Sequence, residues 1–163
     1  MTVTRVSDME TARPTLHDRF KAALARWASG VTVVAAEWDG ERRGMTASSF
    51  SSVSLEPPLI LVCIDEDAHL LPVLERSRRF TVNILAEGQD LVSAHFAGKP
   101  VPDLEPLGSD LSIGGALATL YCSVWQLYPG GDHRIVVGEV EDIRLGEPGK
   151  PIVYWNRGYR SIE

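Results

Sequence analysis

The most informative stretch of the chain holds six hydroxyl side chains within nine positions, 46 to 54. Gly44 and Ala47 are small, so a ligand can approach the backbone amides beside them closely. Hydroxyls and accessible amides are suited to bind a phosphate group or the edge of a polar ring. Alternating Ser and Thr are also common on the exposed face of an ordinary sheet. Spacing alone therefore leaves a ligand wall and a solvated strand as equal alternatives.

The common motifs for nucleotides and for hydrolysis are absent from the sequence. No Gly-x-Gly-x-x-Gly follows a predicted strand, and neither Gly-x-x-x-x-Gly-Lys-Ser/Thr nor Gly-x-Ser-x-Gly occurs. The four histidines, His17, His69, His95 and His133, are too scattered to form a local metal motif. We therefore expect no bound metal, and any nucleotide site must be unconventional.

Composition limits the class of protein further. The chain has 163 residues, which suits one domain, and its net charge of -6 argues against nucleic acid or anionic lipid as a partner. No apolar run approaches the roughly 20 residues of a membrane helix, and residues 1–14 lack the apolar centre of a signal peptide. These features predict a cytoplasmic protein without a membrane contact. Cys63 and Cys122 lie in apolar stretches and are expected to be buried thiols.

The N-terminal part divides into an arm and a helix. Residues 1–14 are polar and patternless, which predicts a flexible arm before a single domain at 15–163. Four apolar residues then recur at helical spacing, and Thr15 is placed to cap the first turn. We expect this helix to pack on the core. The four residues are Leu16, Phe20, Leu24 and Trp27.

The rest of the chain is predicted to be mainly strand. Asp39-Gly40 signals a hairpin after the strand 31–38, and Pro57-Pro58 separates the hydroxyl run from a fully buried strand, 59–64. Asp67 is placed to cap a short helix, and Pro72 must lie in the first turn of this helix or kink it. Further elements are strands at 80–85, 118–128, 133–145 and 151–155, a helix at 89–96, and a loop at 101–115. This pattern predicts a mainly β fold, a small closed or partly open β-barrel with a few short helices.

Five segments in order resemble the flavin reductase-like family. They are GVTVV (30–34), GMTASSFSSVSLEPP (44–58), FTVNIL (80–85), HFAGK (95–99) and GDHRIVVGEV (131–140). The similarity runs from about residue 20 to 159, and is greatest to the reductase components of two-component 4-hydroxyphenylacetate 3-monooxygenases. It implies a split β-barrel homodimer that binds FMN or FAD non-covalently and reduces it with NADH, with NADPH as the alternative donor. The reduced flavin would then diffuse to a separate oxygenase that hydroxylates an aromatic substrate.

The same resemblance implies a set of cofactor-contacting residues. Lys99 is the expected charge partner of the flavin phosphate, His133 assists nicotinamide binding, and residues 156–159 close over the nicotinamide nucleotide. No side chain is expected to act as acid, base or nucleophile, because hydride passes directly between the two cofactors. The full set is Arg43, Thr46, Ala47, Ser48, Ser49, Cys63, Ile64, Asp65, His69, Leu70, His95, Phe96, Lys99, His133, Asn156, Arg157, Gly158 and Tyr159.

Two expectations about the hydroxyl run follow from the flavin chemistry. Small residues such as Gly44 and Ala47 should lie beneath the flat ring, because hydride transfer needs reacting atoms about 3–3.5 Å apart. Residues 46 to 49 should donate hydrogen bonds to the ring edge that gains negative charge on reduction.

Two other classes of protein remain open. A flavin store or sensor would keep the hydroxyl run but would not need His133 or residues 154–159. A pyridoxamine-phosphate oxidase-like enzyme on the same barrel would need a cluster of basic residues for its substrate phosphate. Only scattered Arg and Lys occur in this sequence.

Overall fold

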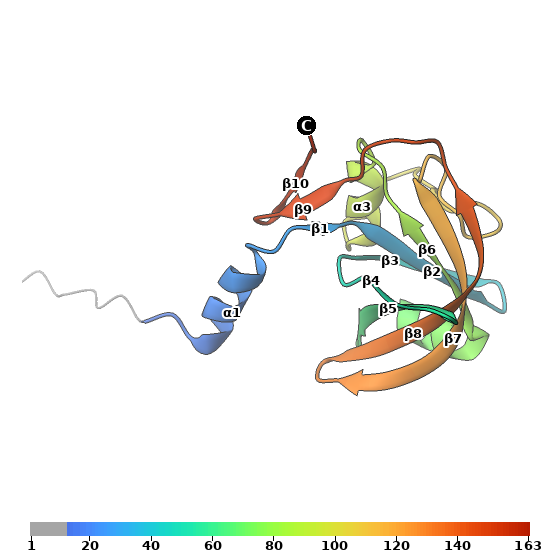
Figure 1. The fold of residues 1–163 in the computed structure, drawn as a ribbon, viewed down its shortest axis with the longest axis horizontal. Helices are drawn as coiled ribbons and strands as arrows, with labels where there is room; N and C mark the ends of the chain where they lie inside the picture. The colour runs from blue at the N-terminus through green and yellow to red at the C-terminus, as the bar shows by residue number, and fades with distance from the viewer. Residues whose placement is uncertain (1–12) are drawn as a thin grey trace, which may run out of the picture.

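Antiparallel pairing organises residues 13–163, the part of the chain that the computed structural model describes. Seven strands form one sheet in the order β3-β2-β6-β7-β8-β5-β4, and three form a small sheet in the order β1-β9-β10 (Figure 1). Most of the predicted arm, residues 1–14, lies outside the described residues. In chain order the elements are α1 (Leu16–Leu24), β1 (Ser29–Gly30), β2 (Thr32–Trp38), β3 (Glu41–Ala47), β4 (Ser51–Leu55), β5 (Pro58–Asp65), α2 (Leu70–Ser77), β6 (Arg79–Ile84), α3 (Asp90–Phe96), β7 (Ala118–Gly130), β8 (His133–Leu145), β9 (Val153–Trp155) and β10 (Gly158–Arg160).

The large sheet curls on itself without closing. Its two edges are β3 and β4, which follow one another in the chain but lie at opposite ends of the strand order. All six pairings between its neighbouring strands are antiparallel. The predicted mainly β fold is therefore confirmed, in the partly open form that a split barrel requires.

The interior of this sheet is filled by alternate strand residues and by α2. Side chains of a strand point to opposite faces in turn, so each strand contributes every second residue to the core. Burial of one such side chain stabilises the fold by roughly 1.5–3 kcal/mol. Members with no exposed surface are Val34, Ala36, Val62, Ile64, Leu74, Val82 and Val136. A second, smaller cluster under β9 and β10 contains Val31, Val33, Leu85, Ile113, Ala116 and Ile152.

The two hairpins predicted from turn signals are present. Asp39 and Gly40 have φ angles of 51° and 78°, the left-handed values of a tight two-residue turn between β2 and β3. β7 and β8 form one long hairpin, as predicted, and their pairing continues to Gly130 and His133 at the tip. Gly131, with a φ of 76°, allows the chain to reverse there.

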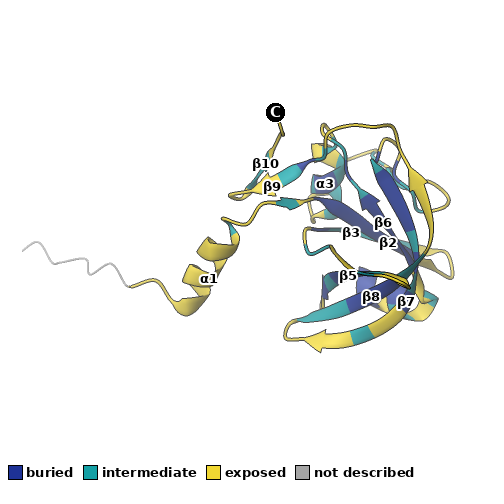
Figure 2. Cartoon of the chain, viewed as in Figure 1, coloured by how far each residue is buried: buried dark blue, intermediate teal, exposed yellow. Residues whose placement is uncertain are grey.

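Helix α1 forms where it was predicted but does not pack on the core. Thr15 caps it through a hydrogen bond from the Asp18 amide at 3.1 Å, and the Asp18 carboxylate accepts from the Thr15 amide at 2.9 Å. No residue of the helix is buried, and the side chains of Phe20 and Trp27 are 58% and 75% exposed. The expectation of core packing is wrong. The segment after the helix, β1, pairs with β9, and the helix before it projects away from the large sheet (Figures 1 and 2).

Strand β5 is half-buried rather than fully buried as predicted. Ile60, Val62 and Ile64 point into the core, whereas the residues between them are partly exposed. The continuous apolar sequence hides this alternation, because a strand with two apolar faces looks the same whether one face or both are covered.

Two helix and strand boundaries also differ from the prediction. Asp67 does not cap α2, which begins after His69; the Asp67 amide instead donates to the Asp65 carboxylate at 2.8 Å. Pro72 lies in the first turn of α2, as predicted. The single last strand predicted at 151–155 is a hairpin, with β9 and β10 joined by a turn at residues 156 and 157.

Candidate functional site

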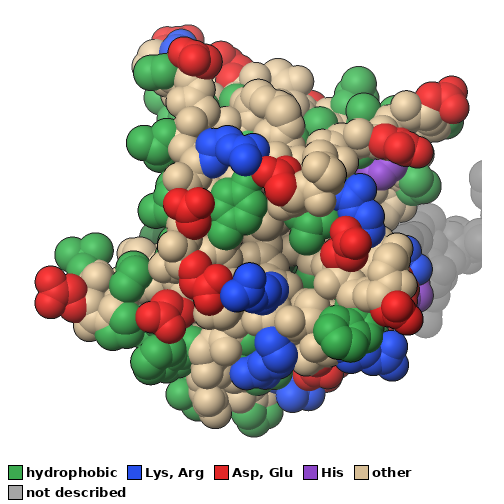
Figure 3. All heavy atoms as spheres, turned by 90° about the vertical axis from the view of Figure 1, so that its right-hand side faces the viewer, with side chains coloured by type: hydrophobic (Ala, Val, Ile, Leu, Met, Phe, Trp, Pro, Cys, Tyr) green, Lys and Arg blue, Asp and Glu red, His purple; other side chains and the backbone are tan. Residues whose placement is uncertain are grey.

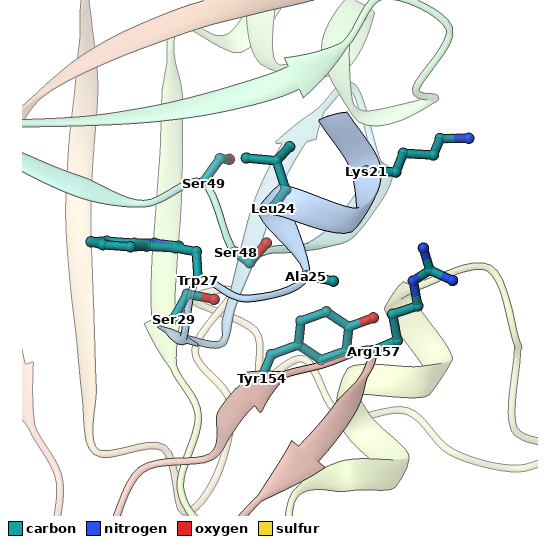
Figure 4. A pocket seen from close by; sticks show the side chains of 9 residues that line it. All are labelled: Lys21, Leu24, Ala25, Trp27, Ser29, Ser48, Ser49, Tyr154 and Arg157. Carbon is teal, nitrogen blue, oxygen red and sulfur yellow. The ribbon is translucent and has the colours of Figure 1, made fainter. Parts of the chain in front are cut away.

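A cleft lies between the end of β3 and the β9–β10 hairpin. It consists of two neighbouring cavities of about 690 Å³ and 430 Å³ that share Ser48, Tyr154 and Arg157. The larger cavity, shown in Figure 4, is also lined by Lys21, Leu24, Ala25, Trp27, Ser29 and Ser49. The smaller is also lined by Val31, Thr46, Ser93, Ala97, Lys99, Gly158 and Tyr159.

The first half of the hydroxyl run forms one wall of this cleft. Thr46, the last residue but one of β3, donates a hydrogen bond of 2.6 Å to the Ser93 carbonyl. Ser49 accepts from the Cys63 amide and donates to the Cys63 carbonyl, both at 3.0 Å, so its hydroxyl joins the chain to β5. Among the described residues the Ser48 hydroxyl has no hydrogen-bond partner, and it is exposed to both cavities. Ser48 is therefore the hydroxyl most available to a ligand.

The two small residues expected beneath a flat ring have other roles. A Cβ atom at Gly44 would lie 2.6 Å from Cε1 of Phe96, so glycine is needed for α3 to approach β3. Ala47 is buried in the core, and its carbonyl accepts a hydrogen bond from Thr32 at 2.8 Å. Protein atoms occupy both side-chain positions, and the placement of these two residues beneath a flavin ring stays a prediction.

The β9–β10 hairpin forms the opposite wall. Asn156 and Arg157 have φ angles of 49° and 60° in its turn, a combination that costs more for Arg than for Asn. The rings of Tyr154 and Tyr159 meet edge to face with centroids 5.8 Å apart. The Tyr159 hydroxyl lies 2.7 Å from that of Ser93, whose side chain is fully buried in α3.

Three cationic side chains line the cleft. Lys99 borders the smaller cavity, Lys21 the larger one, and Arg157 both. In Figure 4 the charged ends of Lys21 and Arg157 extend to the same side of the cavity. Cations at the rim, aromatic surfaces and unpaired donors together fit a flat, anionic ligand such as a flavin nucleotide.

Seven of the predicted cofactor residues line the cleft, and the others do not. Ile64 and Leu70 are buried in the core, and Arg43 pairs with Glu41 at 2.8 Å. His69 is exposed just before α2. The seven are Thr46, Ser48, Ser49, Lys99, Arg157, Gly158 and Tyr159.

A second group of predicted residues gathers at the tip of the β7–β8 hairpin. Asp65 at the end of β5 pairs in register with His133. Nδ1 of His133 lies 2.7 Å from the Asp132 carboxylate, and this hydrogen bond holds the pKa of Asp132 below its usual value. Cys63, two strand positions from Asp65, is half-buried, which raises the pKa of its thiol. The role of His133 toward a nicotinamide remains a prediction.

The residues predicted near Lys99 face another small cavity. His95 accepts a hydrogen bond from the Val101 amide at 3.1 Å, and His95 and Phe96 contact each other edge to face. Both border a cavity of about 300 Å³ that also contacts Arg42 and the 104–107 loop. In this structure they shape the loop beside the cleft.

Sequence reasoning missed nine residues of the cleft, namely Lys21, Leu24, Ala25, Trp27, Ser29, Val31, Ser93, Ala97 and Tyr154. The first four were placed in a helix expected to cover the core. Helical spacing does not predict that these side chains are exposed or half-buried in the folded chain. Tyr154 belongs to an aromatic segment beside the predicted nucleotide residues, which was the one available signal.

Other classes of site are not seen in the described part of the chain. No helix within residues 13–163 has the length and apolarity needed to cross a bilayer. No group of three His, Cys, Asp or Glu side chains in this range is placed to hold a metal. On the face in Figure 3, basic and acidic side chains are interspersed, without a continuous basic area.

Comparison with known proteins matches this architecture. The chain is 56% identical to the Thermus thermophilus 4-hydroxyphenylacetate 3-monooxygenase reductase component over 147 residues, 90% of this chain and 97% of that protein. It is 39% identical to a Rhodococcus NADH-dependent flavin reductase, covering 88% of this chain and 85% of that one. A Streptomyces globisporus NADH:FAD oxidoreductase solved with NAD and FAD fragments superimposes with a TM-score of 0.81 at 35% identity, covering 90% and 94%. Because the flavin reductase like domain also matches residues 24–163, the chain belongs to the flavin reductase-like family.

Proposed function

We propose that this chain reduces FMN or FAD with NADH. The observation that carries the proposal is the pair of adjoining cavities, which share Ser48, Tyr154 and Arg157 and so can hold two ligands in contact. When bound, flavin and nicotinamide supply the redox chemistry, and the protein supplies position and electrostatics. Family membership and the NADH-dependent relatives support the same activity.

The residues of the cleft have distinct tasks in this proposal. The free Ser48 hydroxyl donates to the polar edge of the flavin, where a donor stabilises the charge that reduction adds. Lys99 and Arg157 hold phosphate groups, with Arg157 reaching both cavities. Tyr154 and Trp27 provide apolar surface that excludes water from the rings.

The reduced flavin is proposed to leave for a separate oxygenase, one that hydroxylates 4-hydroxyphenylacetate or a similar aromatic compound. The relatives support this, since the Thermus protein is a monooxygenase reductase component and a Rhodococcus jostii relative is a reductase subunit of a flavin-dependent monooxygenase. An open cleft with no Cys or His among its lining residues suits reversible flavin binding.

The decisive experiment is steady-state NADH oxidation with FMN, FAD and riboflavin in turn, repeated with NADPH. We expect turnover with at least one flavin and preference for NADH. Anaerobic mixing of protein, flavin and NADH separates an enzyme from a flavin store, because only an enzyme bleaches flavin absorbance at catalytic rates. Absence of turnover with every flavin would refute the proposal.

We propose that the chain forms a homodimer through α1. Its apolar side chains Leu16, Phe20 and Leu24 are exposed, and an isolated helix of nine residues is unstable in water without packing. Phe20→Ser should lower the apparent mass in sedimentation experiments from dimer to monomer. Leu91→Ser, at a similarly exposed leucine of α3, should leave a dimer. A monomeric parent protein would contradict the proposal.

We also propose that the protein works in the cytoplasm. Cys63 and Cys122 are both free thiols, which suits a reducing compartment. NADH, the proposed electron donor, is a cytoplasmic metabolite. Fractionation of cells that express the tagged chain, with activity and antigen measured in each fraction, tests this placement.

A further inference from the structure

The β9–β10 hairpin is held to the protein by few interactions. Each of its strands has three residues, and β9 pairs on its other side with only the two residues of β1. A two-stranded hairpin of this size is at best marginally stable alone. Its position over the cleft must therefore come from contacts that its side chains make with the rest of the chain.

The turn of this hairpin contains an unfavourable backbone conformation. Arg157 has a φ of 60°, in the left-handed region that a side chain with a Cβ atom adopts only at an energetic cost. Its neighbour Asn156 is tied to the end of α1 by a hydrogen bond of 2.9 Å to the Ala25 carbonyl. A strained conformation at a binding cleft persists only when the surrounding structure holds it in place.

One pair of hydroxyl groups connects this hairpin to α3 and, through α3, to β3. The Tyr159 hydroxyl on β10 lies 2.7 Å from the Ser93 hydroxyl on α3, and Ser93 has no exposed surface. The carbonyl of the same serine accepts from Thr46 on β3 at 2.6 Å. The hairpin, α3 and the hydroxyl wall thus meet at Ser93. Tyr159 also stands opposite Tyr154 in the hairpin register, so its position determines where Tyr154 lies.

We propose that Ser93 and Tyr159 form a hydroxyl latch that sets the height of the β9–β10 hairpin over the cleft. Through the hairpin, the latch orients Arg157 and Tyr154 toward the nicotinamide nucleotide. Ser93 and Tyr159 are positioning residues in this role and need not touch the reacting atoms. The inference deepens the proposed function and rests on it for the identity of the ligand.

Kinetics of single-atom variants test the latch. Tyr159→Phe and Ser93→Ala each remove one hydroxyl. Each should raise the NADH KM about fivefold, because the hairpin loses one hydrogen bond that holds it in place. The kcat and the flavin Kd should change by less than about twofold, since neither hydroxyl acts on the chemical step. The double variant should be no worse than either single one, because the pair acts as a unit. Tyr121→Phe is the matched control; it removes a tyrosine hydroxyl that binds Asp110 at 2.8 Å and lies outside the cleft lining.

A second comparison separates positioning from a merely structural role. In a Tyr154→Ala/Arg157→Ala background, Tyr159→Phe should have no further effect on the NADH KM, because the latch acts through these two side chains. An unchanged fivefold increase there would overturn the proposal. So would a fall in kcat equal to the rise in KM, which would place Tyr159 in the chemistry itself.

Amide hydrogen exchange tests the latch without flavin or NADH. Tyr159→Phe should speed the exchange of the β9 and β10 amides at least fivefold, whereas Tyr121→Phe should leave them unchanged. Equal exchange in the parent and Tyr159→Phe proteins would overturn the latch even if NADH is oxidised normally. If Tyr159→Phe exchanges faster than the parent protein but the parent oxidises no NADH, the latch is supported and the proposed function is refuted.

Discussion

The two walls of the cleft are held in different ways. The hydroxyl wall continues from β3, an edge strand of the seven-stranded sheet that covers the buried core. The opposite wall consists of the end of α1 and a hairpin with three-residue strands, joined to the body by a few hydrogen bonds. Figure 2 shows the same contrast as buried strands on one side and exposed elements on the other.

This difference indicates a division of labour. Groups on a rigid sheet hold a ligand in a constant place, whereas elements with few buried contacts open at low free energy. An enzyme that binds and releases two diffusible cofactors benefits from one fixed wall and one that moves. The predictions below test this division, from the largest effect to the smallest.

The first prediction concerns the core behind the fixed wall. Leu74 is fully buried in α2, which packs against β2 and β3. Leu74→Ala should lower the free energy of unfolding by about 2–5 kcal/mol through lost burial and the cavity left behind. Urea denaturation measures this change. Leu91→Ala, at a leucine with 65% of its surface exposed, should change it by less than about 0.5 kcal/mol; similar losses in both variants would contradict the contrast.

The second prediction separates two adjacent serines of the fixed wall. Ser49→Ala removes the hydroxyl that bonds both backbone groups of Cys63 and should cost about 1 kcal/mol of unfolding free energy. Ser48→Ala should leave stability unchanged but weaken flavin binding about threefold, the effect of one weak hydrogen bond. Thermal denaturation and fluorescence titration with FMN measure the two effects. A stability loss in Ser48→Ala with none in Ser49→Ala would reverse the assignment.

The third prediction concerns strain in the movable wall. Arg157→Gly removes the cost of a left-handed conformation at this residue, roughly 1–2 kcal/mol. The glycine also raises the entropy of the unfolded chain, which lowers stability by roughly 0.4–1 kcal/mol. We expect a net gain of about 0.5 kcal/mol in unfolding free energy together with a raised NADH KM. Asn156→Gly is the control and should give no gain, because Asn adopts this conformation readily. A destabilised Arg157→Gly protein would show that the turn is not strained.

The smallest effect is expected at a site remote from both walls. The Asp110 carboxylate accepts from Ser112, Tyr121 and Arg144, and the hydrogen bonds from Ser112, the largest influence, hold its pKa well below the usual value. A lowered folded pKa contributes stability above the unfolded value of about 3.9, and this contribution is lost as pH falls below it. The parent protein should therefore exceed Asp110→Asn in stability at pH 6, and the difference should shrink below about pH 4. Urea denaturation at both pH values checks this; a difference independent of pH would contradict it.

Local sequence signals predicted the elements well where the cause is local. Asp39-Gly40 formed a tight hairpin, Thr15 capped α1, and Pro72 fell in the first turn of α2. Each of these effects depends on residues within one turn of each other. The β9–β10 hairpin was missed because its turn uses Asn156-Arg157, and Arg is not a residue that signals a left-handed turn.

The candidate site was predictable only in part. Residues 46, 48 and 49 were found from the density of hydroxyls, and Lys99 and residues 157–159 from the family resemblance; all line the cleft. The side chains of Ile64 and Leu70 lie in the core and not in the cleft, since a residue beside a contacting position can point inward. Spacing also could not predict that Gly44 faces the Phe96 ring, because this contact joins β3 to α3 across 52 positions of the chain.

By itself the sequence determined the mainly β class, the hairpins and the polar wall at residues 46 to 49, since periodicity, turn residues and hydroxyl density are properties of neighbouring positions. Only the tertiary structure decided which hydroxyls remain free, that α1 stands away from the core, and that Ser93 meets Tyr159. The physical reason is that hydrogen-bond satisfaction and burial depend on groups brought together from distant parts of the chain. Ser48 and Ser49 are chemically identical neighbours, and the amide of Cys63 makes one of them structural and leaves the other to bind.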